Sequence, residues 1–236
     1  EVHRLFPEAR TLRMDRDTTS KKNSHEQILE SFGRGDADIL IGTQMIVKGH
    51  DFSRVTLVGV LLADLTLFSG DYRAGERTFD LLPQAAGRAG RGDVPGKVVI
   101  QTYKPDNYAI TAAASQDYRA FYDIEEAYRS LMRYPPEWNM MVIMGTGMDE
   151  EQLANIMDRM YSLIRGKYIN AGHLSVIGPS EPAISKIKDV YRRVLYIKHR
   201  DYRMLVDVKD YVEEWLKENG ENDVSVFFDL NPVNMY

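Results

Sequence analysis

Cysteine is absent from the 236-residue sequence, which excludes both a disulfide framework and a zinc site built from thiolates. The five histidines are scattered and lack the spacing of metal ligands. No apolar run approaches the roughly 18 residues that a membrane-spanning helix needs, and no signal-peptide pattern is present. We therefore expect a cytoplasmic protein that neither crosses a membrane nor holds a metal ion through its own side chains.

An excess of positive charge is also lacking, because the net charge is −5. This net charge argues against binding of nucleic acid by a general electrostatic attraction, so any contact with nucleic acid must come from a local basic patch. Residues 184–203 are the candidate, with seven Lys or Arg, two acidic residues and three interleaved tyrosines. The candidate DNA-contacting residues there are Lys186, Arg192, Arg193 and Lys198. Such a mixture suits DNA or the acidic tail of a partner protein, and a solvated domain face explains it equally well.

The first motif is the stretch from Gln84 to Arg91, in which two Gly-Arg pairs follow a glutamine. Arg88 and Arg91 are three residues apart, so they share one face if the stretch begins a helix. The glycines leave the backbone bare, and two guanidinium groups on an open face match the oxygens of a phosphate chain. The stretch therefore predicts a phosphate-binding site rather than a simple solvated turn.

The second motif runs from Thr43 to Phe52 and follows a short apolar run at residues 38–42. Such a run is typical of a buried strand, and polar loops at the carboxyl ends of parallel strands bind ligands. His50 has no legible nucleophile or carboxylate partner, so we do not expect it to act as a catalytic base. The two motifs, in this order, resemble the fifth and sixth conserved motifs of superfamily 2 helicases.

The chain as a whole predicts two domains, since 44% of its residues are hydrophobic and can form a real core. Strand-like runs alternate with helical patterns up to residue 133, which favours an α/β domain with a mostly parallel sheet. Tyr134-Pro135-Pro136 marks the boundary, because prolines end a helix and extend the chain. Residues 134–236 follow the order β-α-β-β-α-β of a small α+β domain similar to ferredoxin-like folds, with Asp149 capping its first helix.

The chain resembles one family within this superfamily more closely, the primosomal replication-restart DNA helicases, also called the primosomal protein N-prime (PriA) family. The segments that carry it are Thr43 to Phe52, Asp71 to Arg77, the Gln84 motif, Tyr134 to Pro136, and Gly178-Pro179 with Ile184 to Lys188. The resemblance implies a second RecA-like helicase lobe followed by the C-terminal domain of that family. It also implies a 3′→5′ DNA helicase that uses ATP and magnesium at stalled forks, with single-stranded-DNA-binding protein and primosome proteins as partners.

The same resemblance implies roles for individual residues. The catalytic candidates are Arg88 and Arg91, as arginine fingers on the γ-phosphate, and Gln84, which links the attacking water or the phosphate to the lobe. Nucleotide contacts are implied for Gly49, Asp51 and Gly87 as well as for both arginines, and DNA contacts for Thr43, Gln44 and Lys48.

Three elements of such a helicase are missing from the sequence. It contains no Gly-x-x-x-x-Gly-Lys-Ser/Thr phosphate loop and no Asp-Glu-x-His stretch for magnesium. The family's cysteine-rich zinc region is absent too, and the first residue is not methionine, so we expect a fragment that is inactive alone. The alternative is a non-catalytic adaptor built on a RecA-like lobe, but the intact Gln84, Arg88 and Arg91 favour the motor.

Overall fold

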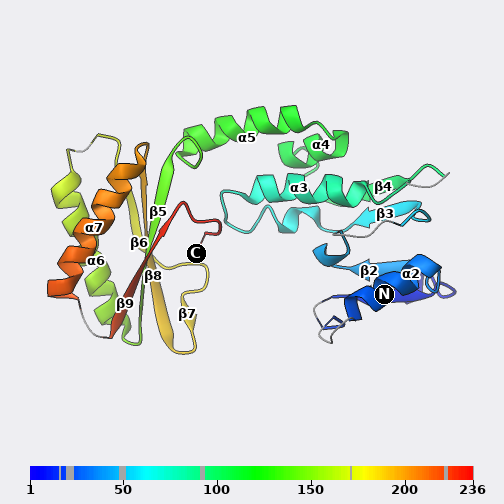
Figure 1. The fold of residues 1–236 in the computed structure, drawn as a ribbon, viewed down its shortest axis with the longest axis horizontal. Helices are drawn as coiled ribbons and strands as arrows, with labels where there is room; N and C mark the ends of the chain where they lie inside the picture. Colours follow the sequence, from blue (N-terminus) through cyan, green and yellow to red (C-terminus); the bar gives the residue numbers. More distant parts are fainter. Residues whose placement is uncertain are drawn as a thin grey trace. The chain divides into compact units, whose positions relative to one another are not determined.

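The computed structural model describes residues 1–15, 17–19, 24–47, 52–90, 94–170, 172–220 and 223–235 (Figure 1). The chain divides into two compact units. The first unit comprises Glu1–Ser69 and Ala74–Tyr122, and the second comprises Gly70–Arg73 and Asp123–Tyr236. Among the described residues, no helix has the length and apolar character that a membrane crossing demands.

The first unit begins with a short helix and a parallel pair of strands. After α1 (Val2–Leu5), β1 (Thr11–Met14) pairs with β2 (Ile39–Gly42), and α2 (Ser24–Arg34) connects them. The register aligns Met14 with Gly42, so both strands end at the same edge. A Cβ at Gly42 would lie 2.5 Å from the Met14 carbonyl oxygen, which explains the glycine at this position.

A second parallel pair follows in the same unit. β3 (Leu57–Val60) pairs with β4 (Lys97–Ile100), and α3 (Ala74–Ala86) and α4 (Tyr108–Ser115) pack together beside it. Phe79 of α3 stacks on Phe121 at the start of α5 (Tyr118–Met132), with ring centroids 4.3 Å apart. The α/β class with parallel strands is thus confirmed. In the described residues, however, the four strands form two separate pairs rather than one sheet.

The carboxyl end of the second pair is fixed by Asp64 in η2 (Ala63–Leu65). This side chain is only 2% exposed and accepts hydrogen bonds from the Thr102 hydroxyl and, at 2.7 Å, from the Tyr103 backbone N–H. Burial alone raises the pKa of Asp64, but these hydrogen bonds outweigh it and the pKa is lowered. A charged Asp64 therefore ties the segment after β3 to the segment after β4.

The second unit is an antiparallel sheet with two helices on one face (Figure 1). Its strands are β5 (Asn139–Gly147), β6 (Ser175–Ser180), β7 (Lys186–Ile187), β8 (Val190–His199) and β9 (Val224–Leu230). They are ordered β6-β8-β5-β9, and β7 pairs with β8. The helices are α6 (Glu150–Tyr168) and α7 (Tyr202–Asn219). Asp149 caps α6 as predicted, accepting a hydrogen bond from the Gln152 backbone N–H.

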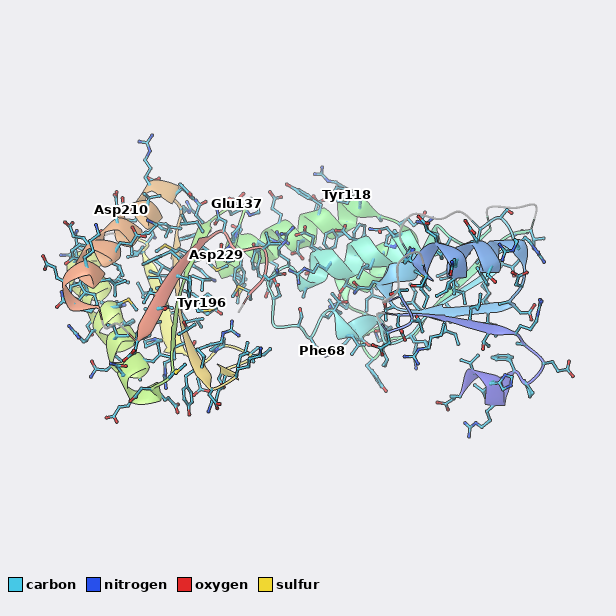
Figure 2. All side chains as sticks on the ribbon, turned by 60° about the horizontal axis from the view of Figure 1, so that its bottom comes forward. Phe68, Tyr118, Glu137, Tyr196, Asp210 and Asp229 are labelled. Atoms are coloured by element: carbon cyan, nitrogen blue, oxygen red, sulfur yellow. The ribbon has the colours of Figure 1, made fainter. Side chains whose placement is uncertain are left out.

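Alternation along the strands sorts the side chains of this sheet into two layers. Met141, Ile143 and Leu195 face the helices and join a core with residues such as Ile156 and Val208. Val142, Met144 and Val194 form a separate buried cluster on the other face. There, Tyr196 on β8 and Asp229 on β9 flank Val142 on the neighbouring strands (Figure 2). A sheet with buried residues on both faces explains why β5 is almost continuously apolar.

Candidate nucleotide and nucleic-acid site

The Gln84 motif lies at the end of α3 and not at the start of a helix, so that part of the prediction is wrong. Gln84 is exposed on the last turn of α3, which ends at Ala86. The backbone then forms a turn in which Gly87 N–H donates to the Pro83 carbonyl at 2.8 Å and Arg88 N–H to the Ala85 carbonyl at 3.1 Å. A cation such as Arg88 is favourable here, because helix C-termini carry partial negative charge.

Gly90 of the motif lies against the chain's own backbone, whereas the sequence predicted a bare backbone open to a ligand. Gly90 has φ +74°, and a Cβ there would lie 2.4 Å from the backbone nitrogen of Gly96. Its N–H also donates to the Val55 carbonyl at 3.0 Å. The glycine is therefore required by the close approach of the chain to itself just before β4, and this approach fixes the turn that carries Arg88.

The two motifs meet through the short helix η1 (Gln44–Val47), which follows β2 and contacts α3. Thr43 precedes η1, and its carbonyl accepts a hydrogen bond from the Ile46 N–H at 3.2 Å. The side chains of Thr43 and Gln44 are exposed. The predicted residues Lys48, Gly49, Asp51 and Arg91 lie outside the described residues.

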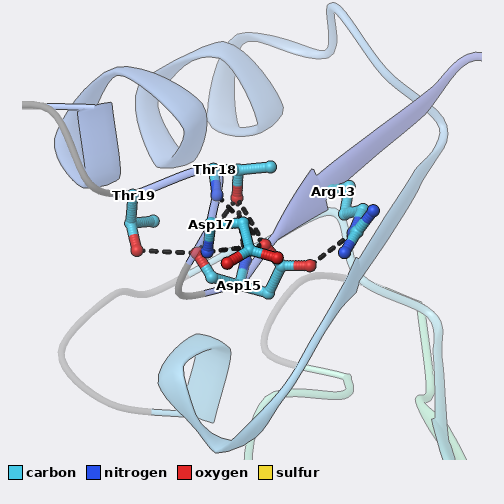
Figure 3. A network of polar contacts seen from close by, with 5 residues as sticks. All are labelled: Arg13, Asp15, Asp17, Thr18 and Thr19. Atoms are coloured by element: carbon cyan, nitrogen blue, oxygen red, sulfur yellow. Dashed lines mark hydrogen bonds and ion pairs between the residues drawn. The ribbon is translucent and has the colours of Figure 1, made fainter.

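A feature not recognised from the sequence is the polar loop that follows β1 (Figure 3). The Asp15 carboxylate accepts hydrogen bonds from the Thr18 N–H at 3.1 Å and the Asp17 N–H at 3.2 Å, and it pairs with Arg13. The Thr18 bond is the largest of the contributions that lower the pKa of Asp15, although burial opposes it. Because β1 and β2 end together, this loop starts beside Thr43. The sequence signal that could have revealed this loop is the Asp-x-x-Thr spacing, which is typical of a local turn held by side-chain hydrogen bonds.

The four basic candidates of residues 184–203 do not share one surface. Pairing across to β5 places Arg192 opposite Thr146 and Arg193 opposite Gly145, so these two side chains point to opposite faces of the sheet. Arg193 lies 3.9 Å from Glu150, and Arg192 donates to the Ile184 carbonyl at 3.1 Å. Lys186 pairs with Asp189 at 3.1 Å and lies over the Tyr191 ring.

Lys198, the fourth of these residues, is only 6% exposed. Its Nζ donates to the Met132 carbonyl at 3.2 Å and lies 3.6 Å from the centroid of the Tyr134 ring. Burial lowers its pKa from 10.5 to about 8, and the positive charge of Arg133 lowers it as well. Lys198 therefore makes its contacts inside the second unit, and its amine is not exposed to solvent.

Comparison with known proteins fits both units. Residues 3–93 match the family described as "Helicase conserved C-terminal domain", and residues 130–233 match "Primosomal protein N C-terminal domain". The replication restart protein PriA of Bacillus subtilis is 41% identical over 100% of this chain and 29% of its own length. This similarity to PriA extends over the whole chain. PriA of Chlamydia trachomatis is 37% identical over 100% of the chain, and PriA of Synechocystis is 34% identical over 98%.

The chain spans less than a third of these PriA proteins, 31% and 27% for the last two. Among solved structures, the de novo designed protein Foldit4 gives a TM-score of only 0.30 at 15% identity, covering 39% of this chain and 97% of that one. This likeness says nothing about function. The helicase-domain match over residues 3–93 includes the Thr43 and Gln84 motifs, two of the segments that carried the resemblance to PriA.

The lowered pKa of Lys198 predicts a specific pH dependence of stability. Between about pH 8 and pH 10.5 the unfolded chain keeps a proton on this amine that the folded chain releases, so this residue favours folding more as the pH rises. The expected result is that the wild type gains stability relative to Lys198→Met between pH 7 and pH 10. Urea unfolding of both proteins at these pH values measures the difference, and a pH-independent difference would show that the assignment is wrong.

Proposed function

We propose that this chain is the C-terminal part of an ATP-dependent 3′→5′ DNA helicase that restarts replication at stalled forks. Support comes from its 34–41% identity to replication restart proteins and from the helicase-domain match over residues 3–93. In this proposal residues 1–133 form the second RecA-like lobe and residues 134–236 a ferredoxin-like domain. The protein works in the cytoplasm on forked and single-stranded DNA, with single-stranded-DNA-binding protein and primosome proteins as partners.

We assign the nucleotide role to the end of α3, where the backbone turns at Gly87 and Arg88 and which belongs to a helix that contacts η1. Negative charge spreads over the oxygens of the phosphoryl group during its transfer, and a guanidinium stabilises that charge. We assign Arg88 and Arg91 to this role and Gln84 to a contact with the attacking water or the phosphate. Gly49, Gly87 and Asp51 are assigned to contacts at the edge of the nucleotide. This assignment uses the arginine fork, because phosphate oxygens accept its paired donors.

Magnesium neutralises charge on the phosphates of bound ATP in such enzymes. The described residues contain no cluster of His, Asp or Glu suited to hold a metal ion. The proposal therefore places the ligands of this ion, the phosphate loop and the family's zinc region on parts of the full-length protein other than this chain. This chain supplies the cationic half of the site.

The DNA role falls to the shared carboxyl edge of β1 and β2. Thr43 and Gln44 are exposed there, at the start of η1 and beside the strand end from which the Asp15 loop begins. Short polar side chains and backbone N–H groups at such an edge suit the phosphates of a DNA strand. We assign Lys48 to the same contact. In the second unit Lys186, Arg192 and Arg193 are the proposed DNA contacts, with Arg192 and Arg193 on opposite faces of the sheet, and Lys198 is left out because its amine is buried.

The experiment that tests the proposal compares this chain with the full-length protein. We expect DNA-stimulated ATP hydrolysis from the full-length protein and no turnover above background from residues 1–236, with or without forked DNA. A coupled phosphate-release assay measures both. Clear turnover by the isolated chain that disappears in Arg88→Ala would contradict the division of the site. A full-length protein without DNA-stimulated turnover would instead favour the adaptor.

A further inference from the structure

Two arginines of the second unit lie over the same indole ring. Trp138 is only 4% exposed, and the guanidinium carbons of Arg133 and Arg200 lie 5.0 Å and 5.4 Å from the centre of its ring. Both arginines are exposed to solvent. A contact with a ring face uses no hydrogen-bond acceptor, so it leaves the N–H donors of each guanidinium available for another partner. We call these three residues the Trp138 cluster.

Backbone contacts inside the second unit fix the points from which the two arginine side chains extend. Arg133 follows the end of α5 with φ +58°, and its N–H donates to the Ser130 carbonyl at 3.3 Å. Arg200 comes directly after β8, and its carbonyl accepts a hydrogen bond from the Asn139 side chain at 2.8 Å. The Trp138 cluster is therefore built by the fold of this unit and does not depend on any other part of the chain.

Neither guanidinium of the Trp138 cluster has a carboxylate or carbonyl partner among the residues that the structure describes. The acidic residues nearest to them in sequence are Glu137 and Asp201. Asp201 caps α7, where its carboxylate accepts a hydrogen bond from the Arg203 N–H at 2.9 Å. Glu137 forms no ion pair within the described part of the chain. Two positive charges are thus presented to solvent without neutralisation.

A third positive charge, on Lys198, lies within reach of the field of Arg133. Burial is the main cause of the lowered pKa of Lys198, about 8, and repulsion by the charge of Arg133 is the second. A leucine or a methionine would cover the Trp138 ring without such repulsion. Bringing like charges together costs free energy, and the binding of an anion removes that cost. The arrangement therefore favours an anionic ligand.

The basic residues at the other end of β8 are less available to a ligand. Lys186 pairs with Asp189 at 3.1 Å, and Arg192 donates to the Ile184 carbonyl at 3.1 Å. A phosphate that approaches either side chain competes with an acceptor that is already in place. The Trp138 cluster instead offers two guanidinium groups whose donors no described acceptor occupies.

We propose that Arg133 and Arg200 of the Trp138 cluster bind phosphates of a single DNA strand. The planar fork of a guanidinium matches the oxygens of a phosphodiester, and two such forks beside one ring suit a ligand whose negative charge is repeated. The inference rests on the proposed function, which supplies single-stranded and forked DNA as the ligand. Trp138 is buried, so bases do not stack on it and the contact does not depend on base sequence.

The test measures binding of single-stranded oligo-dT to the full-length protein by fluorescence anisotropy over a range of salt concentrations. In Arg133→Gln/Arg200→Gln we expect about 10-fold weaker binding at low salt. The slope of log affinity against log salt should fall by about 0.7 for each arginine, because each phosphate contact releases counterions from the strand. An oligo-dC strand should show the same loss, since phosphate contacts carry no sequence information.

Two further double variants make this result specific. Arg133→Lys/Arg200→Lys keeps both charges but loses the forks, so it should retain the salt slope and lose part of the affinity. Arg159→Gln/Lys217→Gln is the charge-matched control. Arg159 also lies over an indole ring, that of Trp215 at 4.8 Å, but its guanidinium donates to Asn219 at the far end of α7. We expect wild-type affinity and slope from the control.

The inference is overturned if Arg133→Gln/Arg200→Gln binds oligo-dT with wild-type affinity and slope, or loses no more than the control. It is overturned as well if the variant loses only the binding of a poly-glutamate peptide, because the Trp138 cluster then serves an acidic protein segment. Should the double variant fail to fold, each single variant is expected to show half of the slope change. A full-length wild type that binds no DNA refutes the proposed function itself, whereas an unchanged variant of a DNA-binding wild type refutes this inference alone.

Discussion

Replacement of Arg88 by alanine in the full-length protein is expected to lower DNA-stimulated ATP turnover by about 10³-fold or more. The reason is that, in the proposed function, the guanidinium at the end of α3 stabilises charge that appears only as the phosphoryl group is transferred. Affinity for ATP should change little, so the loss should appear in kcat and not in KM. Steady-state hydrolysis with saturating forked DNA measures both constants.

Two further variants make the Arg88 result specific. Arg88→Lys keeps the charge but loses the planar fork of donors, and we expect it to recover only a small part of the activity. Arg34→Ala removes an exposed arginine of the same unit that pairs with Asp36 at 2.9 Å, and we expect wild-type turnover from it. Turnover of Arg88→Ala within threefold of wild type would exclude the arginine-finger role.

Replacement of Arg129 by methionine is expected to destabilise the second unit by about 3–5 kcal/mol. Arg129 Nε lies 2.7 Å from Glu125 Oε1, and the side chains of Arg129 and Glu125 are 11% and 7% exposed. Removal of the guanidinium takes the nearest printed positive charge away from the buried Glu125 carboxylate, which costs more than the ion pair contributes when intact. Chemical denaturation monitored by tryptophan fluorescence is suitable, because Trp138 and Trp215 both lie in this unit.

The double variant Arg129→Met/Glu125→Leu distinguishes this explanation from a simple loss of packing. With both charges removed, stability should return to within about 1–2 kcal/mol of wild type. The comparison variant Lys209→Met breaks another i,i+4 pair of the same unit, with Glu213 at 2.8 Å, and it should have little effect because that pair is partly exposed. A double variant as unstable as Arg129→Met would contradict the explanation.

Local signals predicted much of the secondary structure. The apolar and aromatic spacing from Tyr118 to Met132 predicts a helix, and α5 spans these residues. Asp149 was predicted as a cap, and its carboxylate accepts a hydrogen bond from an N–H group in the first turn of α6. Residues 191–198 also predict a strand, and β8 spans residues 190–199. Each of these features depends on residues close together in sequence.

Features that depend on distant contacts could not be predicted. Lys198 belongs to a basic run, and only the packing of Tyr134 and Met132 around it shows that it is buried. Tyr72 was noted as part of a family segment, but its partner Pro232 is 160 positions away. The turn at Gly90 was expected to open the backbone to a ligand, whereas Gly96 fills that space.

The most direct test of the central claim is the affinity of the full-length protein for a mimic of the phosphoryl-transfer state. Isothermal titration with ADP and aluminium fluoride, in the presence of forked DNA, compares wild type with Arg88→Ala. We predict that the variant binds this mimic about 100-fold or more weakly while its affinity for a non-hydrolysable ATP analogue stays within about threefold. Equal affinity of the two proteins for the mimic would contradict the assignment of Arg88 to the reacting phosphate.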